Sequence, residues 1–175
     1  MPSQIQILNT HLTGKEKSLA GIFSRKSLTD LKIADVFNMS SNLSEDQFKR
    51  AAFLLCNPIS QQLLHSKNTK KILEEYGQFK WVVEIRYLPG VTDNVGHTAE
   101  EIIKENLKNI KTSLSVGSAQ LLFLNTSEKR VVEAIATEQS NPLIHHIGIL
   151  RYSEYLKRLR SDKKIYFNVK LPKKS

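Results

Sequence analysis

The stretch from Trp81 to Ile103 constrains the fold of this chain more than any other segment. It opens with β-branched and aromatic residues from Trp81 to Tyr87, a pattern that predicts a strand. Pro89 and Gly90 end that strand, because proline has no N–H for a ladder and glycine accepts a positive φ. Thr98 and Glu101 then have the spacing of a capping box, and they predict the start of a helix. The helix has one apolar face, made of Ala99, Ile103, Leu107 and Ile110.

Other segments predict further strands and helices. Strands are expected over 4–8, 32–39, 119–125 and 143–151, and 59–65 is either a strand or a turn. Helices are expected over 15–27, after the capping box of Ser44 and Gln47, and after Thr126, where Val131, Ile135 and Ala136 form the inner stripe. Asn57-Pro58 and Asn141-Pro142 are structural helix stops, because a residue before proline avoids helical angles.

These elements recur in the same order in both halves of the chain. The repeat divides it into a first unit over 1–66, a connection over 67–78 with a helical turn near Ile72, and a second unit over 79–152. A basic tail over 153–175 follows, in which alternating apolar residues from Ile165 to Leu171 predict an extra strand. Either unit alone leaves a sheet face or edge bare. We therefore expect an α+β fold of two tandem β-α-β(β)-α-β units packed as a pseudo-dimer, with antiparallel sheets and helices on one face.

The net charge of +9 is concentrated at the C-terminal end. The last 19 residues hold eight of the 26 Lys and Arg side chains and one acid, Asp162, so they account for +7 of it. The remainder is close to neutral, and we interpret the tail as a solvated or acid-facing linker rather than a nucleic-acid arm. No apolar run is long enough for a membrane span, and the single cysteine, Cys56, excludes an internal disulfide, so a cytoplasmic protein is expected.

Catalytic motifs are absent from the sequence. It has no glycine-rich phosphate loop, and one cysteine excludes thiolate metal clusters. His145 and His146 are adjacent in a predicted strand and should point to opposite faces, so no metal site is expected there. Cys56 is interpreted as a small buried apolar group. Asp93 has either the role of an Asx-type turn residue or a functional one.

Two motifs carry a resemblance to a known family. Glu84 to Asp93, with Pro89-Gly90-Val91-Thr92-Asp93, resembles the first strand and loop of the PurS-type subunit of phosphoribosylformylglycinamidine synthase, an enzyme of de novo purine biosynthesis. Asn141-Pro142-Leu143-Ile144 is similar to the Asn-Pro-x-Ile with which that family passes from its second helix to its last strand. The order and spacing of the motifs fit, and together they cover about half of the chain. The doubled unit resembles the tandem N-terminal domain of the long synthases.

The resemblance implies a structural component without an active site. Such a unit bridges a glutaminase and an ATP-dependent synthetase during ammonia transfer, and these two components are the expected partners, as subunits or as domains of one enzyme. The chain itself then needs no cofactor, and ATP, Mg and glutamine are used by the partner domains. The resemblance makes Pro89, Gly90, Val91 and Asp93 the expected partner-contact loop, and the first unit has only Leu12-Thr13-Gly14 at that place.

Two other classes of function remain open. An RNA-binding α+β module would use the basic tail and the aromatic residues Phe79, Trp81 and Tyr87, although the chain has no basic-Gly-aromatic stacking motif. A ligand-sensing regulatory domain of ACT-like topology is the third possibility, for which the sequence shows no binding signature.

Overall fold

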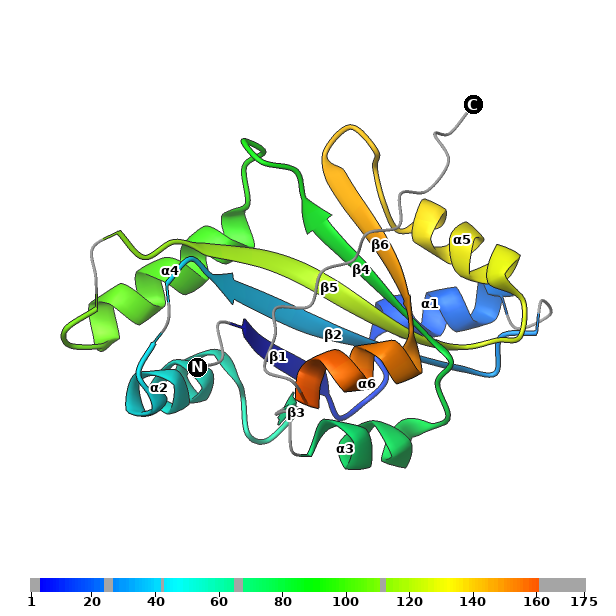
Figure 1. Cartoon of the computed structure of the whole chain (residues 1–175), viewed down its shortest axis with the longest axis horizontal. Helices are drawn as coiled ribbons and strands as arrows, with labels where there is room; N and C mark the ends of the chain where they lie inside the picture. Colours follow the sequence, from blue (N-terminus) through cyan, green and yellow to red (C-terminus); the bar gives the residue numbers. More distant parts are fainter. Residues whose placement is uncertain (1–3, 24–26, 42, 65–67, 111–112, 161–175) are drawn as a thin grey trace.

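The fold is described from a computed structural model, which covers residues 4–23, 27–41, 43–64, 68–110 and 113–160. Strands and helices alternate throughout (Figure 1). The strands are β1 (Gln4–Asn9), β2 (Asp30–Met39), β3 (Gln61–Leu64), β4 (Trp81–Tyr87), β5 (Val116–Asn125) and β6 (His145–Arg151). The helices are α1 (Gly14–Phe23), α2 (Glu45–Leu55), α3 (Thr69–Tyr76), α4 (Asn94–Asn106), α5 (Lys129–Glu138) and α6 (Tyr152–Arg160).

All of these strands belong to one antiparallel sheet with the order β3-β1-β2-β5-β4-β6. Read from either edge, the order passes from the third strand of a half to its first and then its second. The halves meet at β2 and β5, which pair along their whole length from Asp30↔Asn125 to Met39↔Val116. The two halves therefore share a single continuous sheet rather than two separate ones.

Four helices cover one face of this sheet, which we call the helix face. α1 and α5 enclose an apolar cluster with β2, β4, β5 and β6, and it contains Leu19, Trp81, Leu122 and Ile135. α2 and α4 enclose a second cluster over β1 and the other ends of β2 and β5, including Ile5, Phe48 and Ile103. The inner stripe predicted for α5 is buried, as are Ala99, Ile103 and Leu107 of the stripe predicted for α4. α4 ends at Asn106, so Ile110 lies beyond the helix, where it is partly buried.

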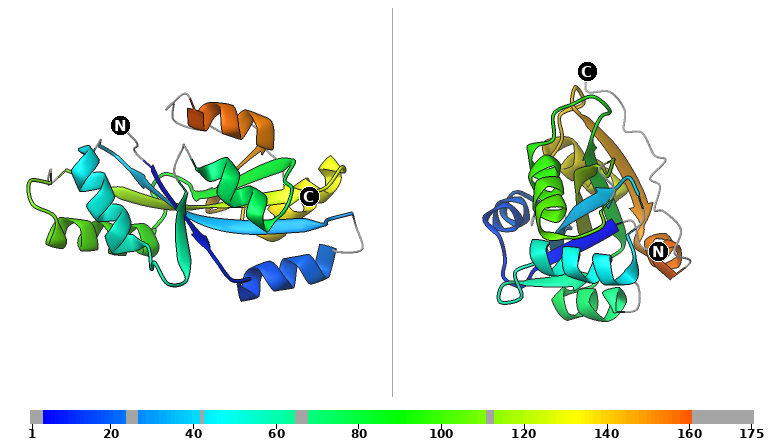
Figure 2. Two further views of the ribbon diagram at one scale, coloured as in Figure 1. Left: turned by 90° about the horizontal axis from the view of Figure 1, so that it is seen from below. Right: turned by 90° about the vertical axis from the view of Figure 1, so that its left-hand side faces the viewer.

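The opposite face is covered by α3 and α6, and the left panel of Figure 2 shows α1 and α6 on opposite sides of the sheet. Leu73 of α3 and Tyr155 of α6 are fully buried against Val82, Leu121 and Phe123. The expectation that helices lie on one face only is therefore wrong. The connection predicted over 67–78 contains the helix α3 instead of one turn, and the start of the basic tail belongs to α6. The strand expected from Ile165 to Leu171 lies outside the described residues.

The start of α4 also differs from the prediction. The helix begins at Asn94, with Asp93 as its N-cap, so Thr98 and Glu101 lie inside it. Thr98 Oγ1 donates to the carbonyl of Asn94, and Glu101 pairs with His97 instead of reaching back to a cap. The carboxylate of Asp93 is the stronger acceptor for the first N–H groups of a helix, which explains why the helix starts there. The capping box of Ser44 and Gln47 is formed as predicted.

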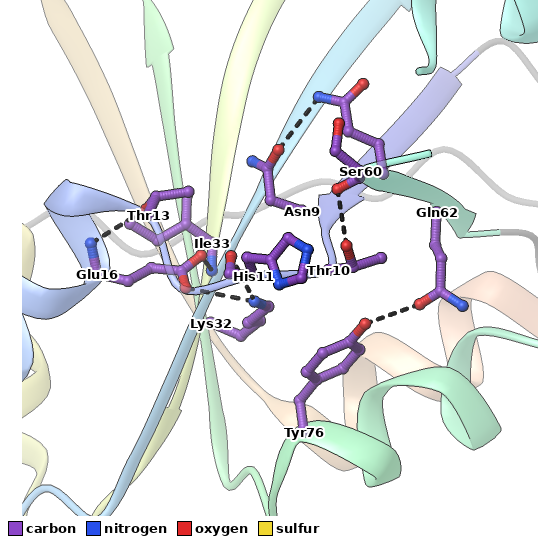
Figure 3. A network of polar contacts seen from close by, with 11 residues as sticks. Asn9, Thr10, His11, Thr13, Glu16, Lys32, Ile33, Ser60, Gln62 and Tyr76 are labelled. Atoms are coloured by element: carbon purple, nitrogen blue, oxygen red, sulfur yellow. Dashed lines mark hydrogen bonds and ion pairs between the residues drawn. The ribbon is translucent and has the colours of Figure 1, made fainter. Parts of the chain in front are cut away.

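Polar side chains fill the place where β1 separates from β2 (Figure 3). The pairing of β1 with β2 ends at Leu8↔Ala34, and Glu16 Oε1 accepts the next free N–H of β2, from Ile33, at 3.3 Å. On the other side of β1, Thr10 Oγ1 donates to the carbonyl of Ser60 at 3.0 Å. Glu16, in the first turn of α1, thus accepts the hydrogen bond that β1 would accept if its pairing with β2 continued.

Candidate functional site

A polar strip interrupts the helix face where the two halves meet. Asp35 of β2 and Gln120 of β5 are directly opposite each other, and Gln120 Nε2 donates to Asp35 Oδ1 at 3.2 Å. Their neighbours on the same face, such as Ile33 and Leu122, belong to one apolar cluster, whereas Phe37 packs on the other. The two clusters are therefore separated by a carboxylate and an amide at the centre of the sheet.

Lys15, at the start of α1, extends over this strip. Its Nζ donates to Gln120 Oε1 at 2.5 Å, so the Gln120 amide joins the ammonium to the Asp35 carboxylate. Burial lowers the pKa of Lys15, and the Asp35 carboxylate opposes that effect. Beside these groups lies a pocket of about 270 Å³, which we call the central pocket. It is lined by Lys15, Asp35, Val36, Phe37, Ile85, Arg86, Tyr87, Val95, Ser118, Ala119, Gln120, Gln139 and His145.

His145 supplies a further polar group to the central pocket. Its Nδ1 accepts the backbone N–H of Asn141 at 2.9 Å, which assigns the ring proton of the neutral imidazole to Nε2. Burial lowers the pKa of His145, and the Lys15 ammonium lowers it further, so the ring is neutral at pH 7. The ring packs beside Tyr87, with 5.1 Å between the ring centroids. His145 is thus held as an N–H donor.

The loop from Pro89 to Asp93 runs between two residues of the pocket lining, Tyr87 and Val95. Pro89 and Gly90 are exposed at its tip, and Gly90 has φ +82°, as the third position of a type II turn requires. The N–H of Val91 closes that turn on the carbonyl of Leu88 at 3.2 Å. The loop is therefore a defined turn with an exposed tip.

Asp93 faces the protein instead of solvent. Its carboxylate accepts the N–H of Gly96 at 2.8 Å, the hydroxyl of Ser118 at 2.6 Å and the N–H of Ser118. Burial alone would raise the pKa of Asp93, but these hydrogen bonds outweigh it and lower the pKa. Asp93 thereby combines the Asx-type capping that the sequence suggested with a connection from α4 to β5 that it did not suggest.

The structure brings together the predicted residues of the second half. The N–H of Leu88 donates to the carbonyl of Ile144 at 2.8 Å, which joins the Pro89 loop to the turn after Asn141-Pro142. In the first half, Thr10 donates in the same way to Ser60 at 2.9 Å, after Asn57-Pro58. Asn57 and Pro58 consequently belong to an equivalent turn on the other half, and neither residue lines the central pocket.

The two Asn-Pro turns have the same internal hydrogen bonds. Asn57 Oδ1 accepts the N–H of Ile59, and Asn141 Oδ1 accepts that of Leu143, both at 3.0 Å. Each turn leaves its apolar residue in water, since Ile59 is 89% exposed and Leu143 is 81% exposed. The two Asn-Pro motifs therefore form the same kind of turn.

Sequence reasoning did not find the centre of the site. Lys15, Asp35 and Gln120 belong to no motif, and they come together only because β2 and β5 pair across the two halves. One signal was present: Asp35 occupies an inward position between Ile33 and Phe37, where an alternating strand should be apolar. A charged residue at such a position indicates either a partner or a site.

The adjacent histidines, Cys56 and the aromatic residues that the sequence singled out occupy ordinary positions in strands and in the apolar core. His145 and His146 pair with Tyr87 and Arg86 respectively, and strand alternation directs them to opposite faces. Cys56 is partly buried against the cluster of α2 and α4, and burial raises its pKa. Phe79 and Trp81 are only 8% and 5% exposed, so they offer no stacking surface for RNA bases in this fold.

Broader comparisons add no family assignment. Neither a scan of protein-family models nor a search of curated protein sequences found a match. Within the described ranges, no three His, Cys, Asp or Glu side chains are grouped so that they could hold a metal ion. No helix in the described part of the chain has the length and apolar character of a membrane span.

Proposed function

We propose that this chain is a non-catalytic, PurS-like unit of phosphoribosylformylglycinamidine synthase, which bridges a glutaminase and an ATP-dependent synthetase. The observation that carries the proposal is the convergence of its two motif segments. The Pro89 loop and the Asn141-Pro142 turn lie far apart in the sequence, yet they are joined by the hydrogen bond from Leu88 to Ile144. A resemblance that rests on two separate motifs is supported when the motifs form one surface.

The arrangement of the sheet supports the finer proposal that two PurS-like units are fused as a pseudo-dimer. Both halves contain strand, helix, strand, helix, strand and helix in that order, and their strands are arranged symmetrically about the β2–β5 pair. Each half would otherwise expose the long edge of its second strand. Fusion in one chain keeps that edge paired, through β2 and β5.

A rigid docking body has a physical purpose in ammonia transfer. Ammonia released into water at neutral pH is mostly protonated and is then no nucleophile, so the donor and acceptor sites must be held together along a protected path. In this proposal the partner components supply glutamine hydrolysis and ATP chemistry, and this chain supplies position. The contact would use Pro89, Gly90 and Val91, while Asp93 holds the loop in shape.

Co-purification with the glutaminase and synthetase components, in the presence of glutamine, ATP and Mg²⁺, tests this function. Val91→Glu places a charge in the loop of the second half, and Leu12→Glu places one in the shorter loop of the first half, where Leu12 is 58% exposed. We expect Val91→Glu to weaken capture at least tenfold and Leu12→Glu to leave it nearly unchanged. If the unaltered chain associates with neither component, the proposal is wrong.

A further inference from the structure

The central pocket has features that the fold itself does not require. Asp35 and Gln120 separate two apolar clusters that cover the same face, and apolar side chains at both positions would join these clusters into one core. Desolvating a carboxylate there is unfavourable unless it is well paired. Residues that break the local pattern in this way are commonly retained for binding.

The charges of the pocket are arranged in a definite order. The Gln120 amide bridges the Lys15 ammonium and the Asp35 carboxylate, by bonds of 2.5 and 3.2 Å. An ammonium has three donors and a carboxylate has two acceptor oxygens, and Gln120 occupies one position on each. A cationic group and an anionic group thus lie on either side of one amide. Each of them can form a further hydrogen bond with a ligand.

The other residues that line the pocket indicate the size and polarity of a ligand that would fit. The Nε2–H of His145, which lines the same pocket as Lys15, adds a neutral donor. Phe37, Ile85 and Val95 contribute apolar surface. A volume of about 270 Å³ is below the usual range for nucleotide-sized ligands, and the Asp35 carboxylate opposes a phosphate.

We propose that the central pocket binds a small zwitterion of the α-amino-acid type, with its carboxylate on Lys15 and His145 and its ammonium on Asp35. An α-amino acid carries its ammonium and its carboxylate on one carbon atom, so the two charges are as close together as the groups that the single Gln120 amide bridges, Lys15 and Asp35. This inference does not rest on the proposed docking function, because Pro89, Gly90 and Val91 do not line the pocket.

Titration of the ¹⁵N-labelled full chain with each of the protein amino acids tests the inference. Backbone amide shifts of Ser118 and Gln120 report occupancy. The single-charge probes are the compounds that match the bound amino acid but lack its ammonium or its carboxylate, which for alanine are propionate and ethylamine. We expect at least one amino acid to bind with a millimolar or lower Kd, and its single-charge analogues to bind at least tenfold more weakly.

Substitutions at the two charges complete the test. Lys15→Met and Asp35→Asn should each weaken that binding at least tenfold. Lys17→Met should not change it, because Lys17 is on the same helix but does not line the pocket. Amide spectra of the variants without ligand verify that they are folded. The inference is overturned if no amino acid shifts the pocket amides at 20 mM, if an analogue with one charge binds equally well, or if a folded Lys15→Met protein binds with unchanged affinity.

Discussion

Glu16 Oε2 and Lys32 Nζ lie 3.3 Å apart in an ion pair whose two side chains are almost completely buried. The pair occupies the gap where β1 leaves β2, and Figure 3 shows the two side chains meeting there from α1 and β2. Lys32 Nζ also contacts the carbonyl of His11 at 3.4 Å and lies over the ring of Tyr76, 4.6 Å from its centroid. The charges are thus compensated by several long contacts instead of one short bond.

This geometry predicts that removing one of the two charges destabilises the fold more than removing both. Lys32→Met leaves the Glu16 carboxylate buried without its cation and should lower the free energy of unfolding by about 3–5 kcal/mol. The double variant Glu16→Leu with Lys32→Met removes both charges and should recover most of that loss. Urea denaturation of the two single variants and the double variant measures the coupling, and additive effects would show that the two charges do not interact.

Asp93 accepts the first backbone N–H of β5 beyond the end of its pairing with β4, as Glu16 does for β2 beyond the end of its pairing with β1. The pairing of β4 with β5 ends at Arg86↔Ala119, and the N–H of Ser118, the next residue, donates to Asp93, as that of Ile33 donates to Glu16. Asp93→Ala removes both this acceptor and the cap of α4, so we expect a loss of about 2–4 kcal/mol. Asp46→Ala, which removes an exposed acid from the start of α2, should cost no more than about 1 kcal/mol.

The same carboxylate gives a pH dependence of defined sign. The pKa of Asp93 is lower in the folded protein than in the unfolded chain, so its contribution is complete above pH 3.8 and is lost as pH falls through the folded pKa. The stability difference between the wild type and Asp93→Ala should therefore shrink on acidification. A difference that stays constant between pH 6 and pH 2.5 would contradict this assignment.

Gly96 allows α4 to approach β5 closely. A Cβ at this position would lie 2.5 Å from the carbonyl oxygen of Val116 and 2.6 Å from Asp93 Oδ2, both below any normal contact. Gly96→Ala should therefore destabilise the fold by about 2 kcal/mol or more through strain. Gly21, inside α1, has open space at the same point, so Gly21→Ala should stabilise by up to about 1 kcal/mol. Thermal unfolding of the two variants should thus shift in opposite directions.

The sequence predicts most elements of this fold, and what it misses has a physical reason. The strand from Trp81 to Tyr87 and the Ser44 capping box depend on neighbours along the chain, and the structure contains both. α6 was not predicted because its buried residue, Tyr155, is followed by a last turn that contains Lys157, Arg158 and Arg160, and the segment was interpreted as part of the basic tail. The central pocket was hidden because Asp35 and Gln120 are 85 positions apart and meet only through the β2–β5 register. Local patterns specify elements, whereas this site is created by the pairing of the two halves.

The carboxylate of Glu84 is buried on the face of the sheet that α3 and α6 cover. It is 2% exposed, it lies opposite Gly148 of β6, and its Oε1 has no hydrogen-bond partner. The nearest cation is Arg86, whose Nε is 3.6 Å from Oε1, beyond hydrogen-bonding distance. Burial raises the pKa of Glu84 to about 7, an effect that Arg86 only partly opposes.

The sign of the resulting pH dependence follows from linkage. The folded protein binds the Glu84 proton more tightly than the unfolded chain, whose pKa is 4.5, so the contribution of Glu84 to stability is fully present below pH 4.5 and is lost as pH rises through about 7. Glu84→Gln removes this titration. It should match the wild type near pH 4.5 and exceed it by up to about 3 kcal/mol at pH 8, as measured by urea denaturation.

Glu100 is the matched control for this experiment. The ion pair with Lys104 holds the pKa of Glu100 below its usual value despite partial burial, so its stabilisation is present above pH 4.5 and is lost on acidification. Glu100→Gln should therefore be less stable than the wild type at pH 8, the reverse of Glu84→Gln. If the stability curves of the wild type and Glu84→Gln run parallel from pH 4.5 to pH 8, the Glu84 carboxylate is hydrated in solution and this face of the sheet opens to water.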